Sequence, residues 1–76
     1  MAVLKTNVDN NELRTICIKD GGMESDFFDA MEVENISRYK DGEITFYVYA
    51  LHCDFGDAQE KLEKALSYNK KDYKWL

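Results

Sequence analysis

The sequence predicts a single small α+β domain over residues 1–76, with a four-stranded antiparallel sheet and two helices in the order β-β-α-β-β-α. Three observations support this prediction. Purely apolar and more polar side chains alternate over residues 43–52, which is typical of a strand. The dipeptide Asp41-Gly42 directly precedes that segment and favours a tight hairpin turn. Apolar residues recur every three or four positions over residues 58–66, as on one face of a helix.

The first part of the chain predicts a β-hairpin. Residues 2–8 are expected to form a short strand, and residues 12–19 a second strand whose side chains alternate between two faces. The polar stretch 9–11, Asp-Asn-Asn, tolerates left-handed backbone conformations and is expected to be the turn between them. Residues 20–22, Asp-Gly-Gly, are expected to end the second strand.

A short helix is expected next, over residues 23–31. Met23, Phe27 and Met31 recur every four residues and form an apolar stripe at helical period. The acidic side chains between them would face away from this stripe. A helix of this length needs packing against the rest of the domain to persist.

The middle of the chain predicts a second hairpin. Residues 34–40 form the expected third strand, Asp41-Gly42 a type I′ turn, and residues 43–52 the fourth strand. We expect the purely apolar face of the fourth strand to lie on the core and its amphipathic face to stay partly solvated. The first face comprises Ile44, Phe46, Val48 and Ala50, and the second comprises Thr45, Tyr47, Tyr49 and Leu51.

The main helix is expected to begin at a cap provided by Asp54 or Asp57, because Asp is a preferred N-cap residue and Glu60 follows Asp57 at capping-box spacing. A strongly aromatic tail, residues 72–76, ends the chain. The apolar stripe of the helix comprises Ala58, Leu62, Ala65 and Leu66.

The negative charge of the chain is concentrated in one segment. The net charge is −5, and the stretch from Asp20 to Glu34 holds six acids with no Lys or Arg. These acids are Asp20, Glu24, Asp26, Asp29, Glu32 and Glu34. The pI of about 4.7 argues against direct binding to DNA, RNA or anionic lipid, which require clustered Lys and Arg. It favours a partner with a basic surface.

The acidic segment predicts a protein-binding surface. Acids three residues apart on a helix lie about 4.5 Å apart along its axis, which is near the spacing of about 3.4 Å between phosphates on one DNA strand. The leading hypothesis is therefore a non-enzymatic inhibitor or modulator, of the type that phages and mobile elements carry, which occludes a nucleic-acid-binding site on another protein. The predicted charged contacts are Glu24, Asp26, Asp29, Glu32 and Glu34, and the predicted apolar anchors are Phe28, Tyr47 and Tyr49.

Two alternatives remain open from the sequence. In one, the acidic segment is only a solvated surface, and the chain is a homodimeric structural domain joined through its tyrosine face or an edge strand. In the other, the chain is an accessory subunit of an enzyme.

No catalytic residue, metal ligand or cofactor is predicted. Cys17 and Cys53 have no His at zinc-ligand spacing, and reduced cytoplasmic thiols are expected, with a disulfide as the alternative. His52 and Cys53 are neighbours in a predicted strand and would point to opposite faces, which argues against a Cys–His dyad. Residues 1–8 lack a signal-peptide pattern and no apolar stretch has the length of a membrane span, so a cytoplasmic protein is expected.

Overall fold

The computed structural model of the chain describes residues 2–52 and 56–76. Its elements are β1 (Ala2–Thr6), α1 (Asn10–Asp20), α2 (Ser25–Ala30), β2 (Glu34–Asp41), β3 (Ile44–Leu51), α3 (Gly56–Tyr68) and β4 (Tyr73–Trp75). The predicted α+β class and the four-stranded antiparallel sheet are confirmed. The order of elements is β-α-α-β-β-α-β, with three helices within the described ranges.

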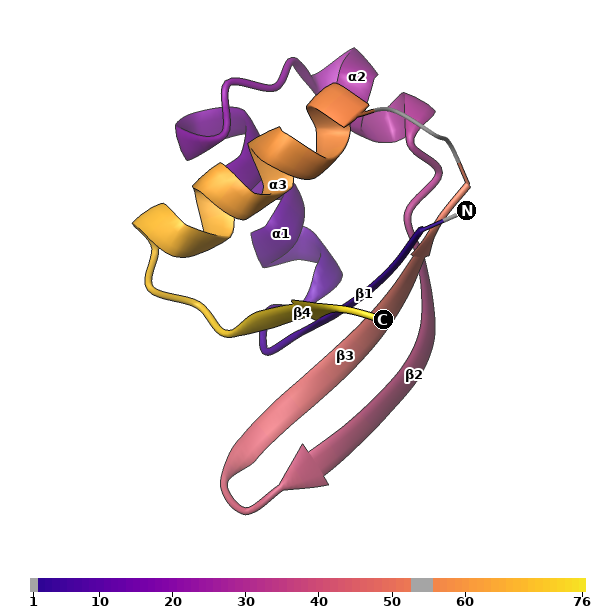
Figure 1. Cartoon of the computed structure of the whole chain (residues 1–76), viewed down its shortest axis with the longest axis vertical. Coiled ribbons are helices and arrows are strands. Elements are labelled where there is room, and N and C mark those ends of the chain that lie inside the picture. Colours follow the sequence, from indigo (N-terminus) through magenta and orange to yellow (C-terminus); the bar gives the residue numbers. More distant parts are fainter. Residues whose placement is uncertain (1, 53–55) are drawn as a thin grey trace.

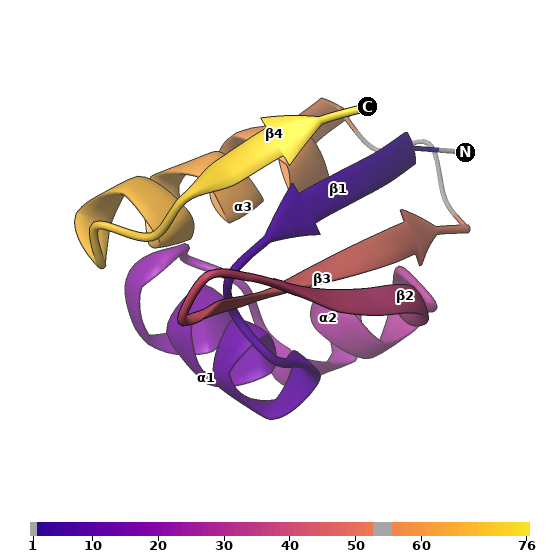
Figure 2. The same ribbon diagram turned by 90° about the horizontal axis from the view of Figure 1, so that it is seen from below.

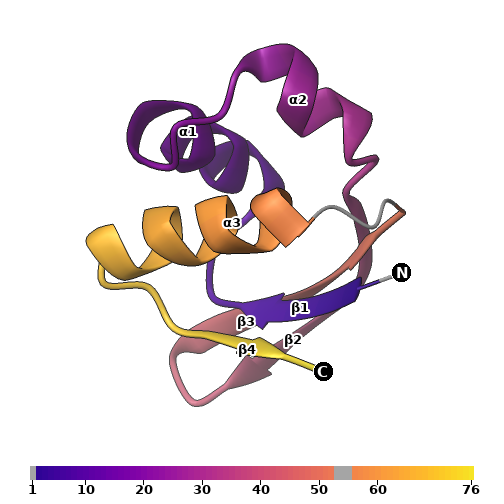
Figure 3. The same ribbon diagram turned by 45° about the horizontal axis from the view of Figure 1, so that its top comes forward.

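The four strands lie side by side in the order β2-β3-β1-β4, and each pairing is antiparallel (Figure 2). The N-terminal strand β1 therefore lies in the interior of the sheet, between β3 and the C-terminal strand β4. The three helices cover the same face of the sheet (Figure 3). The hydrophobic core consequently forms one layer between the sheet and the helices.

The largest difference from the prediction is that residues 12–19 belong to a helix, α1, and not to a strand. Asp9 lies at the N-cap, where its Oδ1 accepts a hydrogen bond from the backbone N–H of Glu12 at 2.8 Å. This bond satisfies one of the backbone donors that a helix leaves unpaired at its start. The predicted hairpin turn at residues 9–11 is therefore wrong, and β1 pairs instead with β3 and β4.

The buried face of α1 explains why the helix forms. Leu13, Ile16 and Cys17 lie at positions i, i+3 and i+4, and all three are buried. The same segment also fits a strand, because Leu13 and Cys17 lie four residues apart and would share one face at a period of two. The sequence therefore contains both the helical and the strand spacing of apolar residues. Packing of this face against α3 favours the helical solution.

The predicted short helix is confirmed as α2, one turn and a half long. Met23 and Met31 flank it and are buried, at 4% and 0% exposure. Within the helix, Phe28 is buried while Phe27 is only partly buried. Its persistence at six residues therefore rests on tertiary contacts.

The face of β3 that packs on the core is the opposite of the predicted one. Tyr49 is fully buried, Tyr47 packs against the core, and Ile44 is 44% exposed. Leu4 of β1 pairs with Tyr49, so both side chains point toward the helices. Tyr49 fits the core because its hydroxyl donates a hydrogen bond to the Val8 carbonyl oxygen at 2.6 Å. The expected core face, Ile44, Phe46, Val48 and Ala50, lies on the other side, and of these only Ala50 is buried.

The second hairpin is confirmed, with its turn one residue later than predicted. Asp41 pairs with Ile44, so the two loop residues are Gly42 and Glu43. Gly42 has a φ of +67°, and Glu43 does not have a positive φ. A positive φ at the first loop position alone, with Gly there, matches a type II′ turn and not the predicted type I′ turn.

Helix α3 begins at Gly56, so Asp57 lies inside its first turn and is not the N-cap. The other predicted cap, Asp54, lies outside the described residues. The predicted apolar stripe is confirmed, because Ala58, Leu62, Ala65 and Leu66 are all buried. The aromatic tail forms β4, and Trp75 Nε1 donates a hydrogen bond to Glu63 Oε2 of α3 at 2.8 Å.

The β2–β3 hairpin extends past the rest of the molecule (Figure 1). Strand β1 pairs with β3 only over residues 47–51. Residues 39–46, here called the projecting hairpin, therefore have only each other as sheet neighbours. The remaining described residues, called the packed body, contain the whole hydrophobic core.

Candidate functional site

The predicted acidic segment runs along the end of the molecule opposite the hairpin turn. It begins at the end of α1, continues through α2, and reaches the first residue of β2 (Figure 1). Its six carboxylates do not share one environment. Three of them have polar partners within the domain, and three are exposed without an ion pair to any described residue.

The paired carboxylates lie at three separate places. Asp20 Oδ2 accepts a hydrogen bond from Asn69 Nδ2 at 3.0 Å, which joins the ends of α1 and α3. Glu34 Oε1 lies 3.6 Å from His52 Nε2 at the other end of the segment. Asp29 Oδ1 accepts a hydrogen bond from Arg14 Nε at 3.3 Å.

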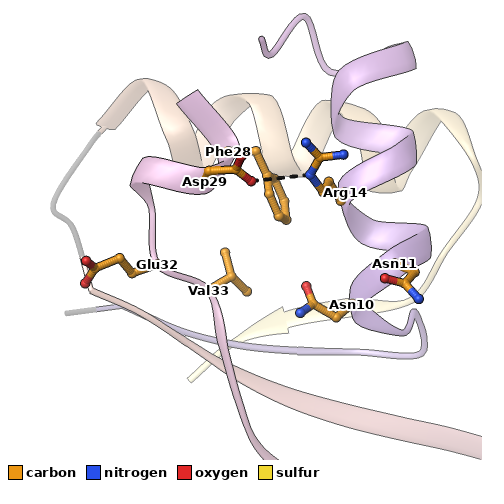
Figure 4. Close-up of a pocket in the computed structure, with 7 residues that line it drawn as sticks. All are labelled: Asn10, Asn11, Arg14, Phe28, Asp29, Glu32 and Val33. Carbon is orange, nitrogen blue, oxygen red and sulfur yellow. Dashed lines mark hydrogen bonds and ion pairs between the residues drawn. The ribbon is translucent and has the colours of Figure 1, made fainter. Parts of the chain in front are cut away.

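The Arg14–Asp29 pair spans the gap between α1 and α2 beside a small open hollow of about 240 Å³. Figure 4 shows Asp29 directed at Arg14, with Glu32 turned away from both. The hollow is lined by Asn10, Asn11, Arg14, Phe28, Asp29, Glu32 and Val33. Because both charged partners are about half exposed, water screens their attraction, and the pair neutralises Asp29 without adding much stability.

The remaining carboxylates, Glu24, Asp26 and Glu32, form the candidate site. All three are exposed, and no basic side chain of the described residues pairs with them. Glu24 occupies the N-cap position of α2 and Asp26 its first turn, where negative charge complements the helix dipole. We call these three residues the acidic site.

Glu32 has an unusual backbone conformation. Its φ is +48°, in the left-handed region that favours Gly or Asn, and it directly follows the C-cap residue of α2, Met31. Its N–H donates to the Asp29 carbonyl oxygen at 3.2 Å, which closes the end of the helix. A charged residue at this strained position is exposed at the corner where the chain leaves α2 for β2.

The predicted apolar anchors are mostly covered by the fold. Tyr49 is fully buried and cannot contact a partner in this fold, and Phe28 is 5% exposed and reaches the surface only at the floor of the hollow. Tyr47 stacks on Tyr49 with ring centroids 6.2 Å apart and is half-buried against the core. The predicted tyrosine face is therefore the inner face of the sheet, covered by helices.

Cys17 is a buried free thiol in the middle of the core. Burial raises the pKa of Cys17 to about 12, which keeps the sulfur protonated and unreactive at neutral pH. Cys53 lies outside the described residues, as does any contact it makes with His52. Among residues 2–52 and 56–76, no three His, Cys, Asp or Glu side chains gather as a metal site would require.

Sequence reasoning missed a second accessible region, the outer edge of the hairpin. Ile36 and Tyr39 of β2 are 52% and 41% exposed there, and Ile44 at the start of β3 is 44% exposed. A signal was present: Arg38 and Lys40 flank Tyr39 at a period of two, which places both basic side chains on one side of a strand.

Comparisons with protein-family models, curated proteins and solved structures found no match to this chain. None of the helices α1, α2 and α3 of the described ranges has the length and apolar character needed to cross a membrane.

Proposed function

We propose that this protein is a small acidic binding module that inhibits or modulates another protein by occupying a basic, nucleic-acid-binding site. The observation that supports this proposal is the acidic site: Glu24, Asp26 and Glu32 are exposed and have no cationic partner among the described residues. Unpaired surface carboxylates are free to make charge-assisted hydrogen bonds with Lys and Arg of a partner.

The proposed mechanism is steric occlusion combined with charge competition. Carboxylates at this end of the molecule would take the positions of phosphates against the cations of the partner. Because both surfaces are charged and exposed, association should be fast at low ionic strength and should weaken steeply as salt screens the attraction.

The proposal is one of binding without catalysis, in the cytoplasm. The raised pKa of the buried Cys17 thiol bears on this one group only: its thiolate, which nucleophilic attack would need, is not populated at neutral pH. The cytoplasm is proposed on composition, because small secreted domains usually depend on several disulfides and this chain has only two cysteines.

The test is capture of the partner from cells that express the protein, repeated at low and high salt and with a competing DNA duplex. The variant Glu24→Lys/Glu32→Lys should lose the captured partner. The matched control Glu43→Lys/Glu60→Lys makes the same charge change at exposed Glu residues elsewhere and should retain it. Duplex DNA should release the partner from the unaltered protein.

If the Glu24→Lys/Glu32→Lys variant still captures the partner, the acidic site is not the surface that binds it. Capture that DNA does not compete would contradict the occlusion of a nucleic-acid-binding site, even where the acidic site is required.

A further inference from the structure

The outer edge of β2 is the longest unpaired strand edge of the described sheet. Among the strands of residues 2–52 and 56–76, β2 lies at the end of the order and pairs only with β3. All eight of its residues are exposed. An edge strand presents backbone N–H and C=O groups that can pair with another extended segment. The opposite edge, β4, is only three residues long.

The regular part of this edge is residues 37–41. A bulge at Ile36 interrupts the pairing of β2 with β3 between Asn35 and Ser37. Asn35 Nδ2 donates to the carbonyl oxygens of Ser37 at 2.8 Å and Val48 at 3.0 Å, which ties the bulge to the sheet. Beyond the bulge the pairing continues without a shift to the turn.

Two basic residues of this stretch present both their side chains and their backbone groups to solvent. The pair that closes a two-residue hairpin loop, here Asp41 and Ile44, is hydrogen-bonded, and bonded pairs then alternate along the ladder. The N–H and C=O groups of Arg38 and Lys40 therefore point away from β3. The side chains of Arg38 and Lys40 lie on one face of the hairpin. On that face they are the cross-strand neighbours of Tyr47 and Thr45.

The other face of the same stretch is aromatic. Tyr39 pairs with Phe46, and their ring centroids lie 5.8 Å apart. Lys5 Nζ lies 4.7 Å from the Phe46 centroid and 5.4 Å from the Tyr39 centroid, so a third cation borders this face.

A second copy of the chain does not fit this edge. Two β2 strands related by a two-fold axis form a continuous sheet only if residues of the same face lie opposite each other. Every such register that pairs at least three residues of 37–41 sets Arg38 against Arg38, Arg38 against Lys40, or Lys40 against Lys40. Like charges directly opposite each other are destabilising.

We propose that the β2 edge binds an extended peptide segment of another protein as a fifth strand, and that this segment alternates acidic and apolar side chains. Two carboxylates placed two residues apart face Arg38 and Lys40, and the apolar side chain between them packs beside Tyr39. The acids of the hairpin, Asp41 and Glu43, lie at the turn, where they limit how far an acidic segment extends. This surface is separate from the acidic site and selects a partner of the opposite charge pattern.

The test is titration of the isotope-labelled protein with a capped ten-residue peptide of alternating Glu and Val, followed by NMR. A capped peptide of alternating Lys and Val is the control. The Glu-Val peptide should shift the amide signals of residues 37–41 and slow the hydrogen exchange of the Arg38 and Lys40 amides, because these groups gain hydrogen-bond partners. The Lys-Val peptide should do neither.

The variant Arg38→Glu/Lys40→Glu should weaken Glu-Val binding at least about tenfold, since it replaces attraction by repulsion. The control Lys19→Glu/Lys64→Glu makes the same net charge change at exposed residues of α1 and α3 and should bind as the unaltered protein does. The proposal is overturned if the Arg38→Glu/Lys40→Glu variant binds equally well, or if the exchange of the Arg38 and Lys40 amides does not slow.

The same experiments distinguish two other occupants of the β2 edge, a second copy of the chain and a nucleic acid. A concentration-dependent dimer in sedimentation that Arg38→Glu/Lys40→Glu abolishes would overturn the proposal in favour of a second copy. Binding of a single-stranded oligonucleotide over Lys5, Tyr39 and Phe46, with no response to the Glu-Val peptide, would overturn it in favour of nucleic acid.

Discussion

The packed body and the projecting hairpin share one strand, β3, and the two parts of that strand have opposite environments. Tyr49 and Leu51 in the packed body are buried by helices, although tyrosine is amphipathic. Ile44 in the projecting hairpin is 44% exposed, although it is purely apolar. The comparison shows that burial in this domain follows which residues β1 and the helices cover, and not the apolar character of the side chain.

The difference also separates the source of stability from the exposed end of the sheet. The packed body contains the core cluster and so supplies most of the hydrophobic free energy of folding. The projecting hairpin contributes accessible backbone and side chains. Substitutions in the two regions should therefore have very different effects on unfolding.

The largest expected effect is truncation of a core residue of α3. Leu62→Ala removes a fully buried side chain and should lower the free energy of unfolding by about 2–5 kcal/mol. Ile44→Ala in the projecting hairpin should cost about 1 kcal/mol, because its side chain keeps 44% of its surface in water and its removal leaves no closed cavity. Urea denaturation of both variants measures the difference, and equal losses would contradict the division into body and hairpin.

The second prediction concerns the close approach of α1 and α3 at Gly21. A Cβ there would lie 2.8 Å from the carbonyl oxygens of Cys17 and Lys61, both of them backbone atoms. Gly21→Ala should therefore destabilise the domain by about 1–3 kcal/mol. Gly56→Ala is the matched control, since a Cβ at Gly56 would meet no heavy atom of the described part of the chain within 4 Å, its own neighbours aside. A neutral Gly21→Ala in thermal denaturation would show that the helices do not pack this closely.

The third prediction is a loss of stability at alkaline pH through Cys17. Burial raises the pKa of Cys17 from 9.0 to about 12 in the folded state. Its contribution to stability is constant below pH 9 and is lost as the pH rises toward 12, because only the unfolded chain ionises there. The slope is about 1.4 kcal/mol per pH unit for one group.

Urea denaturation between pH 8 and 11, in a Cys53→Ser background, measures this slope. Cys17→Ala should make the alkaline loss shallower, whereas Ser67→Ala, at an exposed residue of α3, should leave it unchanged. An identical pH dependence with and without Cys17 would contradict a buried thiol in the packed body.

The smallest expected effect is at the cap of α1. Asp9→Ala removes the acceptor of the Glu12 N–H and should cost about 1 kcal/mol. Asn11→Ala, at an exposed position within the helix, should be neutral or slightly stabilising, because Ala has the higher helix propensity. Denaturant midpoints distinguish them, and a neutral Asp9→Ala would show that the cap does not hold α1.

Local signals in the sequence predicted the parts of the fold that depend on local chemistry. The stripe Ala58 to Leu66 identified α3, and the Asp41-Gly42 dipeptide identified the hairpin within one residue. Helix α1 was missed because its apolar spacing also fits a strand. The signal that could have decided it was Asp9 followed by Glu12 at capping-box spacing.

Two features depend on long-range contacts: which face of the sheet is buried, and which acidic residues have partners within the domain. The neutralisation of Asp29 by Arg14 joins residues fifteen positions apart on two helices, which no local pattern indicates. Likewise, which face of β3 is buried depends on the pairing of β1 with β3 over residues 47–51. The exposure of Glu24, Asp26 and Glu32 was predictable, because charged side chains at and around a short surface helix stay in water unless they are paired.

The most direct test of the whole account is one NMR experiment with two probes of opposite charge. Oligolysine should shift the amide signals of Glu24, Asp26 and Glu32 at the helical end, and the alternating Glu-Val peptide should shift residues 37–41 of β2. Both responses should weaken as salt rises. If both probes perturb the same residues, or if neither perturbs the predicted ones, the proposed division of binding between the helical end and the strand edge is wrong.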